Sequence, residues 1–168
     1  MSPGHPAELN PETLLAECEV TRTRVGGPGG QRRNKVETAV RILHRATGVT
    51  AAAAERRSQV ENQRVALFRL RVSLALQVRF DRRATEPSPL WRSRCRKGNI
   101  VLNPNHDDFP AILAEVLDIL ANLSWQTKSA AEELECTSSQ MIKLLKAEPR
   151  AMVYVNQNRS ELGLHPLR

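Results

Sequence analysis

The chain of 168 residues is poor in aromatic residues and cysteines and has no long apolar run. Aromatic side chains are only 4% of the residues and hydrophobic ones 40%, so we expect a core built mostly of Leu, Val, Ile and Ala. The three cysteines have no paired spacing, which argues against a disulfide framework or a metal site and for a reducing compartment. Neither a membrane span of roughly 18 apolar residues nor a secretory signal is present. These absences predict a cytoplasmic protein without membrane association.

Acidic residues are scarce in one part of the chain. Residues 19–100 hold 19 Lys and Arg against 6 Asp and Glu, whereas the two flanks together hold 6 against 12. A basic module is therefore joined to a mildly acidic one within a net charge of +7. Such a module usually binds a polyanion, most often a nucleic acid. The alternative is a well-solvated helix face.

The basic part reads as a small sheet covered by a helix. Alternation predicts a strand from Cys18 to Arg24 and a hairpin of residues 39–44 and 49–54 around the turn signal at Thr47 and Gly48. A helix then begins near Ser58, where Ser58 and Glu61 fit a capping box, and ends near Phe80. Its apolar stripe consists of Ala66, Leu67, Leu70, Leu74 and Val78. Three arginines are expected to lie off the stripe and face water or phosphate: Arg64, Arg69 and Arg71.

The second half reads as helical. The spacing of apolar residues predicts helices over residues 112–120, 129–134 and 139–147, and Pro149 suits the first turn of a fourth. Ala131, Met141 and Leu144 stand at helix-turn-helix offsets, although Glu135 replaces the usual glycine of the turn. An ordinary helical bundle is the alternative. The fold class is therefore α+β, divided into a lead-in (1–17), a sheet module (18–83), a linker with a basic patch (84–99) and an all-α domain (100–168).

The glycine-rich stretch Gly26–Lys35, GGPGGQRRNK, carries the candidate chemistry. It has neither the GxGxxG spacing of a dinucleotide site nor the ending of a P-loop. A glutamine amide is no general base, but Gln31 can orient a water and its backbone N–H can stabilise an oxyanion. Three cations that follow it would neutralise nearby phosphates: Arg32, Arg33 and Lys35. The alternative is a flexible surface loop.

This stretch resembles the GGQ module of class I peptide-chain release factors, and most closely that of the short stalled-ribosome rescue hydrolases. The residues that match are Pro28-Gly29-Gly30-Gln31, Asn34-Lys35-Val36, Thr47-Gly48-Val49, Arg57-Ser58-Gln59, Asn62 and Ala66. Order, spacing and residue type agree from Cys18 to about Phe80. One departure is Arg32, where family members often have a small polar residue.

The resemblance implies hydrolysis of the peptidyl-tRNA ester in the peptidyl-transferase centre of the large ribosomal subunit. The backbone N–H of Gln31 would stabilise the developing charge, and Gly29 and Gly30 would let the main chain pass. The implied partners are ribosomal RNA and peptidyl-tRNA, bound by a monomer without metal or organic cofactor. The family relation also favours RNA contacts for Arg56, Arg57 and Arg64.

Two departures bear on the type of relative. Only 17 residues precede the first predicted strand, too few for the codon-reading domains of a release factor. From Pro149 onward, the chain also lacks the polybasic tail of the short rescue factors. We therefore expect codon-independent rescue, anchored by the helical domain or by a basic patch with Arg94, Arg96 and Lys97. The alternative is a non-catalytic ribosome- or RNA-binding regulator that reuses the module and carries a helix-turn-helix-like nucleic-acid-binding domain.

Overall fold

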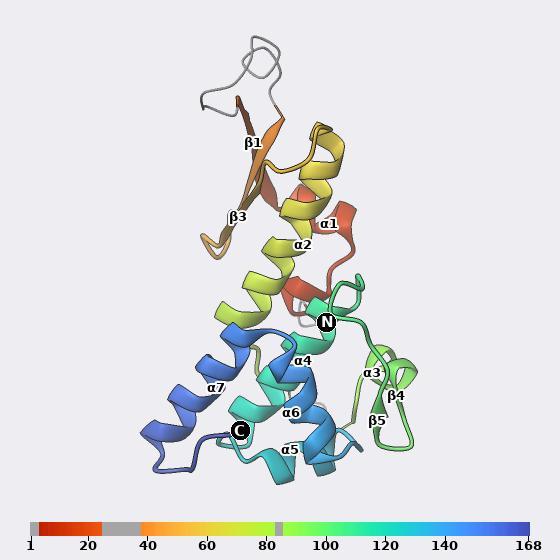
Figure 1. Ribbon diagram of the computed structural model, residues 1–168, viewed down its shortest axis with the longest axis vertical. Coiled ribbons are helices and arrows are strands. Elements are labelled where there is room, and N and C mark those ends of the chain that lie inside the picture. The colour runs from red at the N-terminus through yellow and green to blue at the C-terminus, as the bar shows by residue number, and fades with distance from the viewer. Residues whose placement is uncertain (1–3, 25–37, 83–85) are drawn as a thin grey trace. The chain divides into compact units, whose positions relative to one another are not determined.

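The computed structural model describes residues 4–24, 38–82 and 86–168, and the chain forms two compact units, Met1–Gln77 and Val78–Arg168 (Figure 1). Helices predominate in it beside two small sheets, which confirms the predicted α+β class. Within the described ranges, no helix is both long and apolar enough to cross a membrane.

The first unit contains an antiparallel sheet in the order β1-β2-β3, with one long helix, α2, packed on it. Its elements are a 3-10 helix η1 (Pro6–Glu8), α1 (Pro11–Ala16), β1 (Cys18–Thr23), β2 (Ala39–His44), β3 (Thr50–Ala53) and α2 (Gln59–Gln77). Along β2, Val40, Ile42 and His44 are buried while Arg41 is exposed, as the two-residue period of a strand requires. The β2–β3 hairpin confirms the predicted turn, where Gly48 adopts a φ of +73°.

The helix α2 begins after Ser58, whose hydroxyl accepts a hydrogen bond from the Glu61 N–H at 3.4 Å. Ala66, Leu70 and Leu74 of the predicted stripe are fully buried. The prediction was wrong for Arg71, which is only 7% exposed and donates from Nε to the Ala7 carbonyl at 3.1 Å. The reason is that η1 contacts α2, so that a position off the stripe is covered as well.

The residues before β1 differ from the loose lead-in that the sequence predicted. Pro11 occupies the first turn of α1, and the Asn10 side chain accepts a hydrogen bond from the Thr13 N–H at 2.8 Å. Ala7 and Leu14 are fully buried. The prolines therefore begin short helices here instead of marking an irregular segment.

The second unit is helical with one small hairpin. Its elements are α3 (Pro89–Arg94), β4 (Cys95–Arg96), β5 (Asn99–Ile100), α4 (Phe109–Asn122), α5 (Thr127–Glu133), α6 (Ser138–Lys146) and α7 (Pro149–Glu161). Helix α4 contacts α5 and α6, and α6 contacts α7. Two carboxylates of α4 are buried: Glu115 accepts hydrogen bonds from Ser88, and Asp118 accepts them from Arg79, Phe80 and Arg82.

The structure also differs from the expected linker over residues 84–99. Ser88 caps α3, its hydroxyl accepting from the Trp91 N–H at 3.0 Å. The Trp91 side chain is 1% exposed and donates from Nε1 to the Leu134 carbonyl at 2.7 Å. Residues 89–100 are thus built into the second unit by packing and hydrogen bonds.

Candidate functional site

The glycine-rich stretch joins β1 to β2. Thr23, at the end of β1, is paired with Ala39, at the start of β2, so the segment between them leaves and re-enters the sheet at neighbouring positions. Gln31 lies eight residues after Thr23 and eight residues before Ala39. The predicted catalytic Gly29, Gly30 and Gln31, and the predicted RNA-binding Arg32, Arg33 and Lys35, lie outside the described residues.

One end of this segment is fastened to the helix by Asn62, which is fully buried. Its Nδ2 donates to the Thr38 carbonyl at 2.6 Å and to the Arg56 carbonyl at 3.0 Å, while its Oδ1 accepts from the Arg56 N–H at 2.9 Å. A buried side-chain amide that makes three bonds holds its partners in a defined geometry. Asn62 therefore holds together the residue before β2, the residues before α2, and α2 itself.

Asn62 was part of the sequence motif but received no role from it. A signal was present, because Asn62 is four residues before Ala66, eight before Leu70 and twelve before Leu74, which places a polar residue in line with the apolar stripe. A polar side chain at a buried position needs hydrogen-bond partners. Those partners, Thr38 and Arg56, follow from the tertiary structure alone.

Three predicted RNA-binding arginines of the first unit are exposed: Arg56, Arg57 and Arg64. The Asn62 bonds place the Arg56 backbone beside Thr38, and Arg57 follows it. None of the three has an ion-pair partner among the residues that the structure describes. By contrast, the neighbouring Arg69 is bound to Glu55, with its NH2 group 2.5 Å from Oε1. Arg56 and Arg57 thus lie unpaired next to Thr38, where the segment re-enters the sheet, and this position suits contact with phosphates.

The three cations of the predicted basic patch belong to the second unit and differ in availability. Arg94 donates to Asp108 Oδ2 from Nε at 2.8 Å and from NH2 at 2.6 Å, and its charge is therefore balanced within the unit. Arg96 and Lys97 are exposed in the β4–β5 hairpin and have no such partner in the described part of the chain. The hairpin turn consists of Lys97 and Gly98, with φ values of 51° and 78°. Of the three cations in the predicted patch, Arg94 is therefore paired, and Arg96 and Lys97 remain unpaired among the described residues.

The offsets that suggested a helix-turn-helix correspond to α5 and α6. Ala131, Met141 and Leu144 are all buried. Glu135 adopts a φ of 52°, so it takes the left-handed conformation that glycine usually supplies in such a turn. The Cys136 N–H then donates to the Ala131 carbonyl at 2.9 Å, which closes the end of α5.

A metal site and a reactive thiol would each place requirements on the described residues. No group of three or more His, Cys, Asp or Glu residues is placed there to hold a metal ion. Burial, with a smaller effect of nearby Cys95, raises the pKa of the Cys136 thiol to about 12. This thiol is therefore protonated near neutral pH and is not an activated nucleophile.

Comparison with known families decides the relationship. The family described as "RF-1 domain" matches residues 10–100, more than half of the chain. The chain belongs to the RF-1 domain family. The match includes α1, the three-stranded sheet, α2, α3 and the β4–β5 hairpin of this RF-1 domain protein, and ends before α4.

Its curated relatives are release factors, each matched over a short part of its length. The chain is 49% identical over 70 residues to the chloroplastic peptide chain release factor PrfB1 of Arabidopsis thaliana, covering 42% of this chain and 15% of that protein. It is 44% identical over 68 residues to peptide chain release factor 1 of Symbiobacterium thermophilum (40% and 18%). It is 42% identical over 88 residues to peptide chain release factor 1 of Chloroherpeton thalassium (52% and 24%). The chain thus spans less than a quarter of the length of these relatives, and no solved structure matches it.

Proposed function

We propose that this RF-1 domain protein hydrolyses the ester of peptidyl-tRNA on the ribosome, in translation termination or ribosome rescue. Membership of the family and the release-factor relatives support the reaction. The partners in this proposal are the RNA of the large ribosomal subunit and peptidyl-tRNA, and the compartment is the cytoplasm. Gln31 is the first catalytic residue, supported by Gly29 and Gly30.

In the proposed reaction a water molecule attacks the ester carbonyl, and the bond between that carbon and the ribose oxygen of the terminal adenosine breaks. The peptide leaves with a new carboxyl group, and the ribose oxygen takes a proton from the water. The backbone N–H of Gln31 would donate to the oxygen on which negative charge develops, and its side chain would help to place the water. Donors that are already oriented before the reaction stabilise such charge without reorganising.

The observation that carries this proposal is the attachment of the loop. The segment with Gln31 at its midpoint starts and ends at a paired Thr23 and Ala39, and Asn62 holds Thr38 next to Arg56. A loop with fixed ends can present its midpoint to another molecule, and unpaired arginines at its base can bind RNA phosphates.

The test is release of a labelled peptide from stalled ribosomes by the wild type and by Gln31→Ala. We expect release by the wild type and little or none by the variant, with ribosome binding retained by both. Equal release by both proteins, or none by either, would contradict the proposal. Binding alone is not decisive, because a basic surface binds RNA in any case.

We further propose that the reaction does not depend on a codon. The residues after 100 lie outside the family match and form helices α4–α7, and the β4–β5 hairpin that precedes them is bonded to the start of α6. This unit is a candidate for anchoring the protein to RNA. Release should therefore proceed at similar rates on ribosomes with a stop codon, a sense codon or no codon in the A site. A rate that depends strongly on a stop codon would contradict this part of the proposal.

The second candidate function is a non-catalytic RNA-binding regulator. The α5–α6 pair favours it, because Glu135 adopts the left-handed turn of a helix-turn-helix and the expected core positions are buried. Ribosome binding without release by the wild type would favour this function over hydrolysis.

A further inference from the structure

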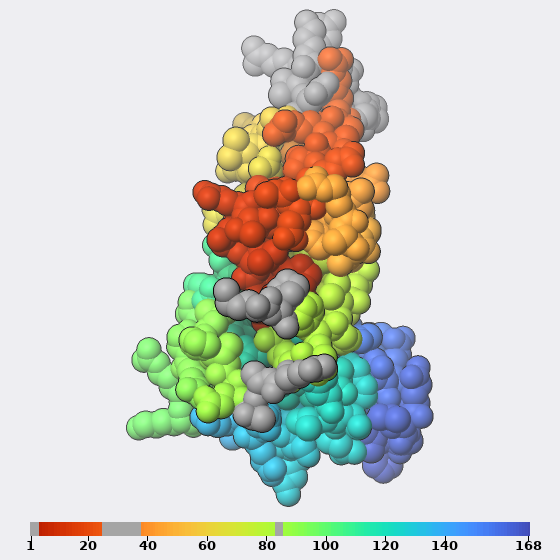
Figure 2. Space-filling model, turned by 180° about the vertical axis from the view of Figure 1, so that it is seen from behind, coloured from red at the N-terminus to blue at the C-terminus, as the bar shows by residue number. Residues whose placement is uncertain are grey.

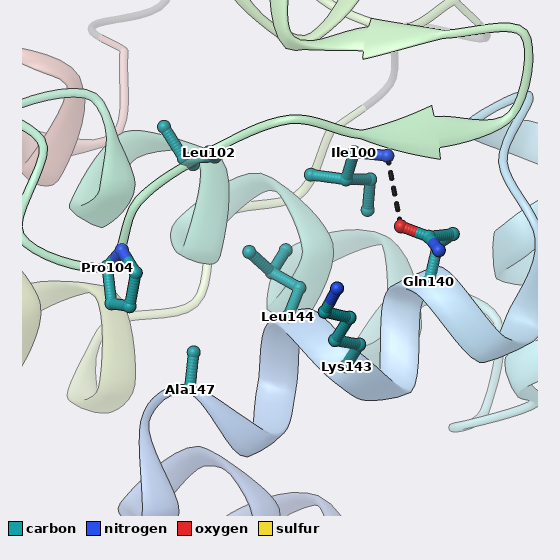
Figure 3. A pocket seen from close by; sticks show the side chains of 7 residues that line it. All are labelled: Ile100, Leu102, Pro104, Gln140, Lys143, Leu144 and Ala147. Carbon is teal, nitrogen blue, oxygen red and sulfur yellow. Dashed lines mark hydrogen bonds between the residues drawn. The ribbon is translucent and has the colours of Figure 1, made fainter.

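The second unit has a pocket of about 200 Å³ between α6 and the segment that runs from β5 to Pro104 (Figure 3). One wall is apolar and comes from Ile100, Leu102 and Pro104. The other wall is α6 and its end, with Gln140, Lys143, Leu144 and Ala147. This volume is below the roughly 300 Å³ at which sites for whole small molecules begin, so it suits one ring system or one side chain.

The two walls are held together by hydrogen bonds. The Ile100 N–H donates to Gln140 Oε1 at 3.2 Å, as drawn in Figure 3. The Thr137 N–H donates to the Gly98 carbonyl at 3.3 Å, at the start of α6. Because Gln140 uses its oxygen in this bond, its Nε2 group remains as a donor with no partner in the described chain. The pocket is therefore preformed and has a donor in its polar wall.

Exposed cations lie on α6 and on the β4–β5 hairpin, the elements that carry this pocket. Lys143 lines it, and in Figure 3 the side-chain nitrogen is turned toward the strand that carries Ile100. Lys146 is exposed one turn further along α6, and Arg96 and Lys97 are exposed in the hairpin bonded to the start of α6. None of the four has an acidic partner in the ranges that the structure describes. The nearby Glu148 is bound to Arg150 at 2.7 Å, although Glu135 remains exposed in the turn.

We infer that this surface, α6 with the β4–β5 hairpin, binds unpaired RNA, with one base in the pocket and the flanking phosphates on the cations. The inference rests on the proposed function, because ribosomal RNA or tRNA would supply the unpaired nucleotides. Proteins recognise RNA mainly at unpaired bases, which can leave the helix and enter a pocket, and a basic groove follows the backbone. An apolar peptide side chain would fit the pocket as well, but it would leave four unpaired cations without a role. Unpaired RNA fits both the pocket and the cations, because it carries apolar base rings and negatively charged phosphates.

The base pocket is tested by filling it. Ala147 is exposed and lines the pocket, so Ala147→Phe should occupy the space without disturbing the core. The probe is a fluorescein-labelled, unstructured 20-nucleotide RNA, titrated with the full chain and followed by anisotropy. Loss of one stacked or inserted base is worth about 1–3 kcal/mol, so affinity should fall roughly 5- to 150-fold. Ala147→Ser, which leaves the pocket open, should bind as the wild type does.

The phosphate contacts are tested by the salt dependence of the same titration. Lys143→Gln with Lys146→Gln should lower the slope of log affinity against log salt by about 0.7 per cation, or about 1.4 in all. The matched control is Lys128→Gln with Arg168→Gln, which removes two exposed cations outside α6 and the hairpin. This control should leave the slope close to that of the wild type. The fluorescence-detected unfolding curve of each variant verifies that the unit is folded.

The possible results separate this inference from the proposed function. Unchanged RNA affinity in Ala147→Phe, or equal slopes in the two double variants, would overturn the inference. Weaker ribosome binding by Ala147→Phe with unchanged RNA affinity would overturn it in favour of a peptide in the pocket. If the wild type releases no peptide, the proposed function fails, while the RNA titrations still decide the inference.

Discussion

The role given to Asn62 can be tested by Asn62→Ala. The change removes three hydrogen bonds at 2.6, 2.9 and 3.0 Å within a fully buried site. Each such bond contributes about 1 kcal/mol net, and buried groups left without a partner cost more. We therefore expect the first unit to lose about 3 kcal/mol of unfolding free energy, which corresponds to a factor of roughly 150 in its equilibrium constant.

The assay must report on the first unit alone. Both tryptophans, Trp91 and Trp125, belong to the second unit, so their fluorescence follows that unit only. Urea unfolding is therefore followed by hydrogen exchange of residues 38–62 and compared with the fluorescence curve. Asn62→Ala should accelerate exchange in these residues and leave the fluorescence midpoint unchanged.

A neighbouring position supplies the control. Gln63 is partly exposed on the same helix and makes no side-chain hydrogen bond in the described structure, so Gln63→Ala should cost little. Asn62→Asp keeps the acceptor for the Arg56 N–H but turns an oxygen toward two carbonyls, and it should cost at least as much as alanine. A loss below about 1 kcal/mol, or one equal to that of Gln63→Ala, would refute the reasoning.

Three further predictions concern packing, pH and thiol reactivity. Trp91→Phe removes the 2.7 Å bond to the Leu134 carbonyl and should cost the second unit about 1–3 kcal/mol, measured by Trp125 fluorescence in urea; a neutral effect would contradict it. Hydrogen bonds from Arg150 lower the pKa of Glu148 from its usual 4.5. Glu148→Gln should therefore lower the unfolding free energy by about 0.5 kcal/mol at pH 7. This difference from the wild type should vanish as the pH falls through the lowered pKa, because the carboxylate is then protonated. Burial raises the pKa of the thiols of Cys18, Cys95 and Cys136. A disulfide reagent at pH 8 should therefore label the native chain slowly and the urea-unfolded chain rapidly, and equal labelling rates would contradict this prediction.

Periodicity predicted the regular elements well because each spans enough residues to show a pattern. Alternation placed the second strand at residues 39–44, where β2 lies. It did not reveal β4 and β5, which have two residues each, too few for a period to appear. The prolines before Trp91 suggested a linker, yet Pro89 begins α3. The region is ordered by the hydrogen bond that Trp91 donates to the distant Leu134 carbonyl. Such long-range partners are not visible in a local pattern.

The same limit applies to the site. The sequence identified the family, which the RF-1 domain match confirms, whereas the role of the glycine-rich stretch stays a prediction. It grouped Arg94 with Arg96 and Lys97 because the three are close in the chain, whereas the structure pairs Arg94 with Asp108. Figure 2 shows one face of the chain coloured by residue number, whereas the balance of each charge depends on contacts between elements. The role of Asn62 also required Thr38 to be placed beside it.

The central claim is that the loop between β1 and β2 brings Gln31 to the ester of peptidyl-tRNA. The most direct measurement is a density map of the full chain bound to a ribosome that carries peptidyl-tRNA. The account predicts the Gln31 backbone N–H within hydrogen-bond reach of the ester at the acylated end of the tRNA. A map in which the protein is bound but Gln31 lies away from that end would contradict it.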